Sequence, residues 1–345
     1  MTAGVTEVTD VTEMTDVTAV TDATGVTDAS PASQRAAAFV ASHESGAEAL
    51  GASLADLIAD PDGLALALRR GLEGLADAEY LESVRDVAPG IGTIHGVRPP
   101  LLAGVARGFK HETRQDRATS LLFVADRLCR EPLLEARWFA FAILDRTLAA
   151  EPERTWQLLR RAAREAGDWI TVDDLARPYA TGIRAERYRW AELEQLAFSP
   201  SRWERRLIGS TIATMSHGGE PAARAENLVP TAVALLDQLM GDADPDVQKA
   251  LAWAYRSLAP LDPVATTAAL RRQVDLAVEN DDGHRAWVVR EGLGKLTPAI
   301  ADELRTRLAG VRKHPGAPST SAAAATAAGF GDLPDPRHHP EPPLA

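Results

Sequence analysis

Apolar residues recur at three- and four-residue steps through most of this chain, which is the spacing of one face of an α-helix. Val247, Leu251, Ala254 and Leu258 form one such stripe. The sequence shows no sustained alternation of apolar and polar residues and no long β-branched run, the two patterns that indicate strands. The periodicity therefore predicts an all-α protein.

Helix starts are marked by residues that satisfy free backbone N–H groups. Asp244 followed by Pro245 fits an N-cap with a proline in the first turn. Ser201 with Glu204, three residues later, fits a capping box. Short breaks carrying Pro, Gly or Asp separate helices of about 10–18 residues. This organisation fits either an irregular helical bundle or a solenoid of stacked helix pairs.

The two ends of the chain differ in composition from the helical part. Residues 1–33 repeat a Val-Thr-Asp theme and contain six carboxylates, no Lys or Arg and no aromatic residue. Residues 313–345 are rich in Ala, Pro, Ser and His. Such segments bury too little apolar surface to offset the entropy lost on ordering. We expect a helical domain over residues 34–312, an acidic disordered tail over 1–33 and an Ala/Pro-rich disordered tail over 313–345.

The formal net charge of −12 argues against a nucleic-acid partner, but most of it lies near the ends of the chain. Residues 34–313 hold 40 acids and 36 bases. A domain this close to neutrality can still present a basic face, because phosphate binding depends on local Lys and Arg placement. Six arginines, whose guanidinium groups suit phosphate oxygens, lie within 23 residues: Arg184, Arg187, Arg189, Arg202, Arg205 and Arg206.

Several chemistries find no support in the sequence. Cys129 is the only cysteine, which excludes an intrachain disulfide, and its place on an apolar stripe indicates a core residue rather than a nucleophile. The eight histidines have no metal-ligand spacing, and there is no glycine-rich phosphate loop. No apolar run approaches the roughly 18 residues of a membrane span, and the N-terminus does not read as a signal peptide. We expect a cytoplasmic monomer without metal or cofactor.

Trp169 and Asp173 are the most informative pair, because they lie four residues apart in Trp169-Ile-Thr-Val-Asp173. On one helix they would share a face, and an aromatic ring beside a carboxylate can hold a positively charged group. In the alternative interpretation, Asp173 and Asp174 only complement a helix start, and Thr171 is the N-cap.

Two further side chains lie off the apolar stripes of their helices. Trp253 falls roughly 140° from the centre of its stripe, so it either packs against a neighbouring helix or is displayed to a ligand. Arg206 points almost opposite its own stripe, so it is either a solvated arginine or a phosphate ligand. The periodicity leaves these alternatives open.

Taken in order, these segments resemble the AlkD-type DNA alkylation repair glycosylases, over roughly residues 80–300. Trp169 and Asp173 match the tryptophan and catalytic aspartate of the family's Trp-Asp-x-Val-Asp motif, from which Ile170 departs. Arg206 matches the second arginine of its Trp-x-Arg-Arg motif, and Trp253 matches the tryptophan that follows Gln-Lys-Ala. Upstream, the segment 92–99 (Gly-Thr-Ile-His-Gly-Val-Arg-Pro) looks like the family's Gly-Val-(Arg/Lys)-x-Pro turn.

The resemblance implies HEAT-like antiparallel helix pairs, stacked in a curved solenoid with a concave face. It also implies excision of N3-methyladenine and N7-methylguanine from duplex DNA without base flipping, and it requires no cofactor. Asp173 would stabilise an oxocarbenium-like sugar and activate water, while Trp169 and Trp253 would flank the deoxyribose. Arg206 would hold a phosphate beside the lesion, and the further expected DNA contacts are Arg205, Arg202 and Arg189.

Two other classes of function remain open. One is a DNA-binding member of the same superfamily that has lost excision activity, against which the retained Asp173 argues. The other is a protein-binding HEAT scaffold, which the net negative charge and the acidic N-terminal segment favour.

Overall fold

The computed structural model describes residues 30–217 and 221–329, and the regular structure in these ranges is helical. The strand-like pairings within them are two isolated bridges, Ala76 with Val97 and Thr93 with Leu133. The prediction of an all-α protein is confirmed. Most of the predicted N-terminal tail and the last part of the predicted C-terminal tail lie outside the described residues.

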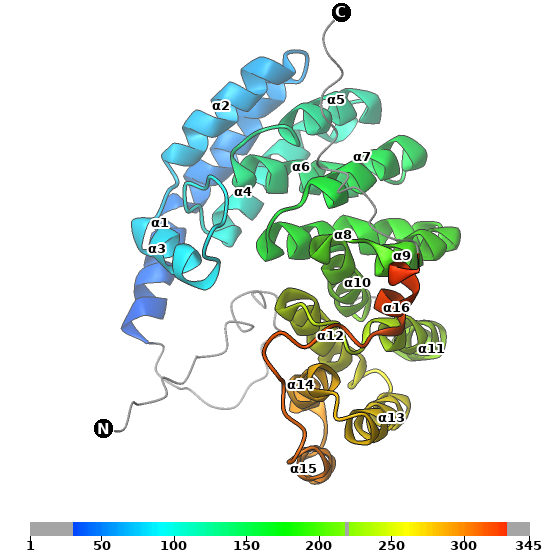
Figure 1. The fold of residues 1–345 in the computed structure, drawn as a ribbon. Helices are drawn as coiled ribbons and strands as arrows, with labels where there is room; N and C mark the ends of the chain where they lie inside the picture. The colour runs from blue at the N-terminus through cyan, green and yellow to red at the C-terminus, as the bar shows by residue number, and fades with distance from the viewer. Residues whose placement is uncertain (1–29, 218–220, 330–345) are drawn as a thin grey trace, which may run out of the picture.

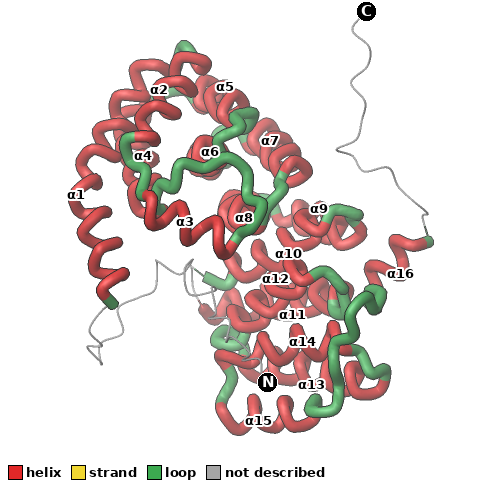
Figure 2. The backbone as a smooth tube through the Cα atoms, turned by 60° about the vertical axis from the view of Figure 1, so that its left-hand side comes forward, coloured by secondary structure: helices red, strands yellow, loops and turns green. Residues whose placement is uncertain are grey.

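Most helices form two rows that curve together in an arc (Figures 1 and 2). Neighbours within the inner row pack side by side, as do most neighbours within the outer row, and helices of the inner row pack against those of the outer row. This is the curved, solenoid-like arrangement that the sequence predicted. The inner row contains α4 (Pro99–Glu112), α6 (Leu134–Thr147), α8 (Trp169–Ala185), α10 (Arg202–Met215), α12 (Pro245–Leu258) and α14 (Gly283–Gly292). The outer row contains α2 (Pro61–Glu73), α5 (Ala118–Leu128), α7 (Pro152–Glu165), α11 (Pro221–Leu239), α13 (Pro263–Glu279) and α15 (Pro298–Arg307).

The remaining helices sit at the ends of the rows or connect them. The long α1 (Pro31–Leu54) packs along α4 and begins three residues before the predicted domain start. None of the helices in the described ranges has the length and apolar character needed to cross a lipid bilayer. Besides α1, the helices outside the two rows are α3 (Ala78–Val87), α9 (Trp190–Gln195) and α16 (Ala322–Ala328). The short 3-10 turns are η2 (Ala55–Leu57), η3 (Thr113–Gln115), η4 (Arg187–Arg189), η5 (Leu196–Phe198) and η6 (Leu293–Lys295).

Local sequence explains how several of these helices start. The carboxylates of Asp244 and Asp262 accept N–H groups of the first turns of α12 and α13, and each precedes a proline. The predicted cap at Asp244 is therefore confirmed. The predicted capping box of α10 is wrong, because the Ser201 side chain makes no capping hydrogen bond and the Glu204 carboxylate accepts from the Ser199 hydroxyl instead.

A continuous cluster of buried apolar side chains fills the space between the two rows. Cys129 lies in it as a free thiol, so its prediction as a core residue is confirmed. A smaller cluster of Val84, Ile94 and Leu134 lies between α3 and the start of α6, and Ile170 of α8 packs against it. The small cluster thus joins the first part of the chain to the start of α8.

Gly209 allows the inner helices α10 and α12 to approach each other unusually closely. A Cβ atom at this position would lie 2.6 Å from the carbonyl carbon and oxygen of Ala250. Any side chain there would push the two helices apart. This close approach brings the first turn of α12 within reach of side chains on α10.

The segment 310–329, here called the C-terminal strap, corrects the prediction of disorder from residue 313 onwards. It runs along the N-terminal ends of α14 and α12 and finishes in α16, which packs against α11 and η5 (Figure 1). The Thr320 N–H donates to the Gly241 carbonyl at 2.9 Å, and His284 Nε2 donates to the Ala317 carbonyl at 3.0 Å. The strap is ordered because loops far away in sequence satisfy its backbone, which composition does not reveal.

Candidate functional site

The start of α8 places Trp169 and Asp173 one turn apart on the same helix. The N-cap is Asp168, whose carboxylate accepts the Thr171 N–H at 2.8 Å and the Thr171 hydroxyl at 2.7 Å. Burial raises the pKa of Asp168, although these hydrogen bonds act against it. Trp138 on α6 donates its indole N–H to Thr171 Oγ1 at 3.0 Å. The alternative with Thr171 as the N-cap is therefore wrong, and the Asp173 carboxylate is not needed to cap the helix.

Three donors from α10 converge on the Asp173 carboxylate. Arg206 Nε donates to Oδ1 at 3.1 Å and Arg206 Nη2 donates to Oδ2 at 2.6 Å. Ser210 Oγ also donates to Oδ1, at 2.6 Å. The Asp173 side chain is 11% exposed and that of Arg206 is 6% exposed. A bidentate arginine and a hydroxyl thus hold the carboxylate in one orientation at the surface of the inner row.

Arg206 is not displayed to solvent, which corrects the prediction that it is a free phosphate ligand. Its Nη1 donates to the Asp246 carbonyl in the first turn of α12 at 2.7 Å. Its guanidinium carbon lies 5.7 Å from the centre of the Trp169 ring, over the ring face. The close contact at Gly209 brings α12 near enough to cover this side chain. Arg206 therefore connects α8, α10 and α12, and its buried guanidinium directs hydrogen bonds from all three nitrogens to groups within the protein.

Trp253 lies half-buried on α12, outside the main apolar cluster. Since α8 packs against α10 and α10 packs against α12, the helices that carry Trp169, Asp173, Arg206 and Trp253 are consecutive members of the inner row. The partial exposure of Trp253 leaves part of its ring available to a ligand.

Asp174 adds a second carboxylate beside Asp173. Its side chain is open to solvent, yet the protein surrounds it closely enough that burial raises its pKa to about 7. Asp173 and Asp145 raise this pKa further, and Arg177 opposes them. Burial and the neighbouring carboxylates thus both favour the neutral form of Asp174, whereas the Arg177 guanidinium favours the charged form.

Arg189, a predicted DNA contact, is fully buried on the far side of α8. Its guanidinium carbon lies 4.7 Å from the centre of the Trp156 ring, and its Nη2 lies 3.1 Å from the Glu153 carboxylate. The prediction is wrong because an arginine can bury its charge against an aromatic face and a carboxylate.

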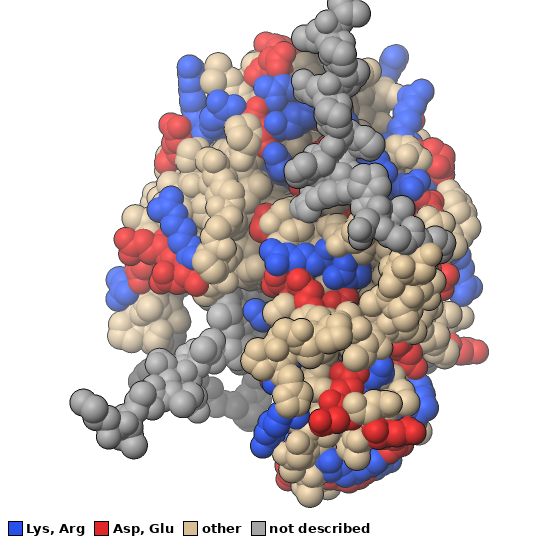
Figure 3. Space-filling view, in the orientation of Figure 1, with Lys and Arg blue, Asp and Glu red and all other residues tan. Residues whose placement is uncertain are grey.

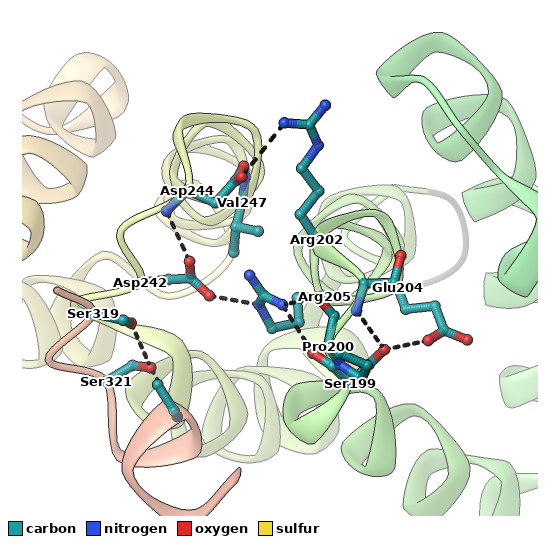
Figure 4. Close-up of polar contacts among 12 residues, drawn as sticks. Ser199, Pro200, Arg202, Glu204, Arg205, Asp242, Asp244, Val247, Ser319 and Ser321 are labelled. Carbon is teal, nitrogen blue, oxygen red and sulfur yellow. Dashed lines mark hydrogen bonds and ion pairs between the residues drawn. The ribbon is translucent and has the colours of Figure 1, made fainter. Parts of the chain in front are cut away.

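Arg205 is likewise engaged within the protein (Figure 4). Its Nε donates to Asp242 Oδ2 at 2.7 Å and its Nη1 donates to the Ser199 carbonyl at 2.8 Å. Arg205, Asp242 and Ser199 line a hollow of about 470 Å³ between the start of α10 and the C-terminal strap. Neither Asp173 nor Trp253 lines this hollow. The prediction of Arg205 as a free DNA contact is wrong because its guanidinium is already engaged by the Asp242 carboxylate and by the carbonyls of Ser199 and Pro200.

Arg202 differs from the other two arginines, because its side chain is half exposed and extends away from the hollow (Figure 4). It stacks on Trp203, with its guanidinium carbon 4.4 Å from the ring centre, and lies 3.7 Å from Asp244. Such a loose ion pair near the surface contributes little and can exchange for another anion. Arg202 as a DNA contact stays a prediction.

The segment 92–99 has a supporting role in the structure. The N–H groups of His95 and Gly96 donate to Glu135 Oε1 at 2.9 Å each, and that of Val97 at 3.3 Å. Gly96 adopts a φ of +83°, which favours glycine. Ile170, which stands where the family motif has an acid, packs against the small apolar cluster beside this turn. The isoleucine thus makes an apolar contact at this position.

Sequence reasoning missed Ser210, which is fully buried and bonded to Asp173. The only signal was its position four residues after Arg206, which places both side chains on one face of α10. It also missed Trp138, for which the sequence offered no comparable signal.

The fold and this site define a helical solenoid-like protein whose inner row carries a fixed carboxylate one turn from a tryptophan on α8, with a second, half-buried tryptophan on α12. Bases and acids lie interspersed on the face shown in Figure 3. The sequence matches the family described as DNA alkylation repair enzyme over residues 68–296, which include the four matched residues of the site. Because the match spans more than half of the chain, the protein belongs to this family. No curated protein gives a significant match to the sequence.

Proposed function

We propose that this protein is a DNA glycosylase that excises N3-methyladenine and N7-methylguanine from duplex DNA without flipping the base. The observation that carries the proposal is the Asp173 carboxylate, one turn after Trp169 on α8, which three donors from α10 hold in one orientation. Trp253 lies on α12, the next inner helix after α10. Membership of a DNA alkylation repair family supports DNA as the partner.

The chemistry requires little more than these groups. Alkylation at N3 or N7 makes the purine cationic and therefore a good leaving group. The bond from C1′ to the base nitrogen breaks with its electron pair going to the base, and the sugar becomes oxocarbenium-like. Water then adds to C1′ and loses a proton. Asp173 stabilises the positive sugar and accepts that proton.

Arg206 acts in this proposal as a positioning residue rather than as a phosphate ligand. Together with Ser210 it fixes the direction of the carboxylate, and its bond to the Asp246 carbonyl sets the distance between α8 and α12. Trp169 and Trp253 would then flank the deoxyribose, where ring faces favour a developing positive charge. Arg202, the exposed arginine of the set, would contact a phosphate.

A base-release assay on methylated duplex DNA tests the proposal. The wild-type protein should release N7-methylguanine, and Asp173→Asn should lose most of this activity while still binding the duplex. A wild-type protein that binds the duplex but releases no base would favour the non-catalytic alternative. A protein that neither binds nor releases would favour the protein-binding scaffold.

A further inference from the structure

The C-terminal strap belongs to a long stretch of the acidic chain that lacks carboxylates. No Asp or Glu occurs from Leu304 to Gly331, although the chain has 49 acids and 37 bases in total. The same stretch contains five groups that are cationic or can become so: Arg305, Arg307, Arg312, Lys313 and His314. Its first two arginines lie on α15 and pair with Asp302 and Asp275. The strap itself therefore carries the surplus positive charge.

Arg312 of the strap acts on a further cation, Arg290 of α14, and Lys313 lies over Trp287 of the same helix. Arg290 of α14 donates to the carbonyls of Leu308 and Val311, at 2.7 and 2.6 Å. Burial lowers the pKa of Arg290, and the nearby charge of Arg312 lowers it further. Among the described residues, no carboxylate oxygen lies within 4 Å of a side-chain nitrogen of Arg290, Arg312 or Lys313, unlike most arginines of the protein. The three cations, called here the α14 cluster, lack a close counter-charge.

Lys313 is held in position although its side chain is exposed. Its Nζ donates to Gln248 Oε1 at 2.7 Å and lies 5.6 Å from the centre of the Trp287 ring. The Gln248 amide is itself fixed, because Nε2 donates to His284 Nδ1 at 3.2 Å. Burial lowers the pKa of Lys313, and the charge of Asp244 acts against this shift. The ammonium thus lies over an aromatic ring next to an uncharged amide, with no carboxylate as a direct partner among the described residues.

The position of the cluster relates it to the candidate site. Trp287 is a half-buried tryptophan of α14, the inner helix that packs beside the helix of Trp253. The strap runs beside α12 and α14, at the C-terminal end of the inner row, in both the ribbon and the tube view (Figures 1 and 2). Asp244 acts on Lys313 at longer range, and the Asp281 carboxylate lies 3.9 Å from His314. The cluster is therefore a local excess of positive charge on the same row as Asp173.

We propose that Arg312 and Lys313 of the C-terminal strap, together with Trp287, bind the phosphate backbone of duplex DNA beyond the lesion. The inference rests on the proposed function, and it extends the DNA-binding face from α12 to α14. Adjacent helix axes lie about 8–10 Å apart, and the duplex rises about 3.4 Å per base pair. With the duplex axis along the inner row, the cluster meets the backbone roughly three base pairs from the sugar that faces Trp253.

The test uses the full chain with both strap cations removed, Arg312→Ala with Lys313→Ala. Two lost phosphate contacts should lower the slope of log affinity against log salt by about 1.8 and weaken binding roughly ten- to sixtyfold at about 0.1 M salt. The matched control is Arg305→Ala with Arg307→Ala, which removes the same charge from α15 a few residues away. This control should bind as the wild type does, and melting curves of both variants check that the fold is intact.

Duplex length gives a second readout. Shortening the duplex arm that passes α14, to fewer than about three base pairs from the lesion, should abolish the difference between wild type and the strap variant. Shortening the opposite arm should leave the difference intact. Lys313→Arg, which keeps the charge, should retain most of the affinity.

The outcomes separate this inference from the function on which it rests. If the strap variant binds with wild-type affinity and salt slope while the wild type excises N7-methylguanine, the inference is overturned and the proposed function stands. An equal loss in the α15 control also overturns it, because only total charge would then matter. If the wild type binds no duplex at all, both proposals fail.

Discussion

The buried pair of Asp173 and Arg206 makes a quantitative prediction about charge. A bidentate guanidinium lies about 4 Å behind the carboxylate, so a sugar cation about 4 Å in front of Asp173 would lie about 8 Å from the Arg206 charge. At an effective dielectric constant of about 20, the carboxylate stabilises that cation by about 4 kcal/mol and the guanidinium opposes it by about 2 kcal/mol. The intact pair therefore leaves a net stabilisation of about 2 kcal/mol.

Asp173→Asn removes the favourable part and leaves the unfavourable one. The loss of about 4 kcal/mol corresponds to roughly three decades of rate. Adding Arg206→Met removes the opposing charge, so the double variant should release N7-methylguanine roughly thirtyfold faster than Asp173→Asn alone. It should still be roughly thirtyfold slower than the wild type.

The free energy of unfolding should rank the wild type, the double variant and Asp173→Asn in the same order as their rates of base release, for an independent reason. Removing one partner of a buried ion pair typically costs about 3–5 kcal/mol, whereas replacing both partners by neutral groups costs little. Asp173→Asn should therefore melt well below the wild type, and the double variant should recover most of the loss.

Single-turnover base release with enzyme in excess measures the rates, at a temperature where circular dichroism shows all variants folded. A double variant no faster than Asp173→Asn would refute the geometry, because the Arg206 charge would then not act on the reacting sugar. Full activity in Asp173→Asn would refute the role of the carboxylate itself.

Three further predictions follow from individual contacts. Ser210→Ala should slow base release roughly tenfold or more at unchanged duplex affinity, since a hydrogen bond to a charged group contributes about 1.5–3 kcal/mol. Thr211→Val, which removes a buried hydroxyl that has no partner, is the control in the same assay. Gly209→Ala should cost about 1–3 kcal/mol in a denaturant titration, because the added Cβ meets the α12 backbone; wild-type stability would contradict the close contact. Burial raises the pKa of Asp282, but hydrogen bonds and a neighbouring guanidinium outweigh it and hold the pKa below its usual 3.8. Its stabilisation of the strap, through Thr320, is therefore present above pH 3.8 and lost as the pH falls further; proteolysis of the strap across this range, with Asp282→Asn as the comparison, measures the effect.

The local part of the site was predictable from sequence. Whether Trp169 and Asp173 share a face depends only on helix geometry, and the motif fixed their spacing at four residues. The cap at Asp244 was predictable for the same reason, since an aspartate before a proline satisfies its own first turn. The spacing of the apolar stripes likewise determined that the chain is helical.

The burial of the arginines was decided only by the tertiary structure. A stripe analysis assumes one buried face for each helix, but α10 lies between α8 and α12 and also packs on α11. Arg206, which points away from its stripe, is therefore covered by a neighbour rather than by water. Arg189 is buried in the same way against Trp156.

Composition predicted disorder at both ends of the chain, and within the described residues it misjudged the C-terminal strap. Whether a Pro- and Ala-rich segment is ordered depends on partners that lie far away in sequence, here the Gly241 carbonyl, His284 and the Asp282 carboxylate. The sequence determined which aromatic, acidic and basic side chains this protein has at the candidate site. The tertiary structure decided which of them remain exposed, because burial depends on contacts between helices and not on the period within one.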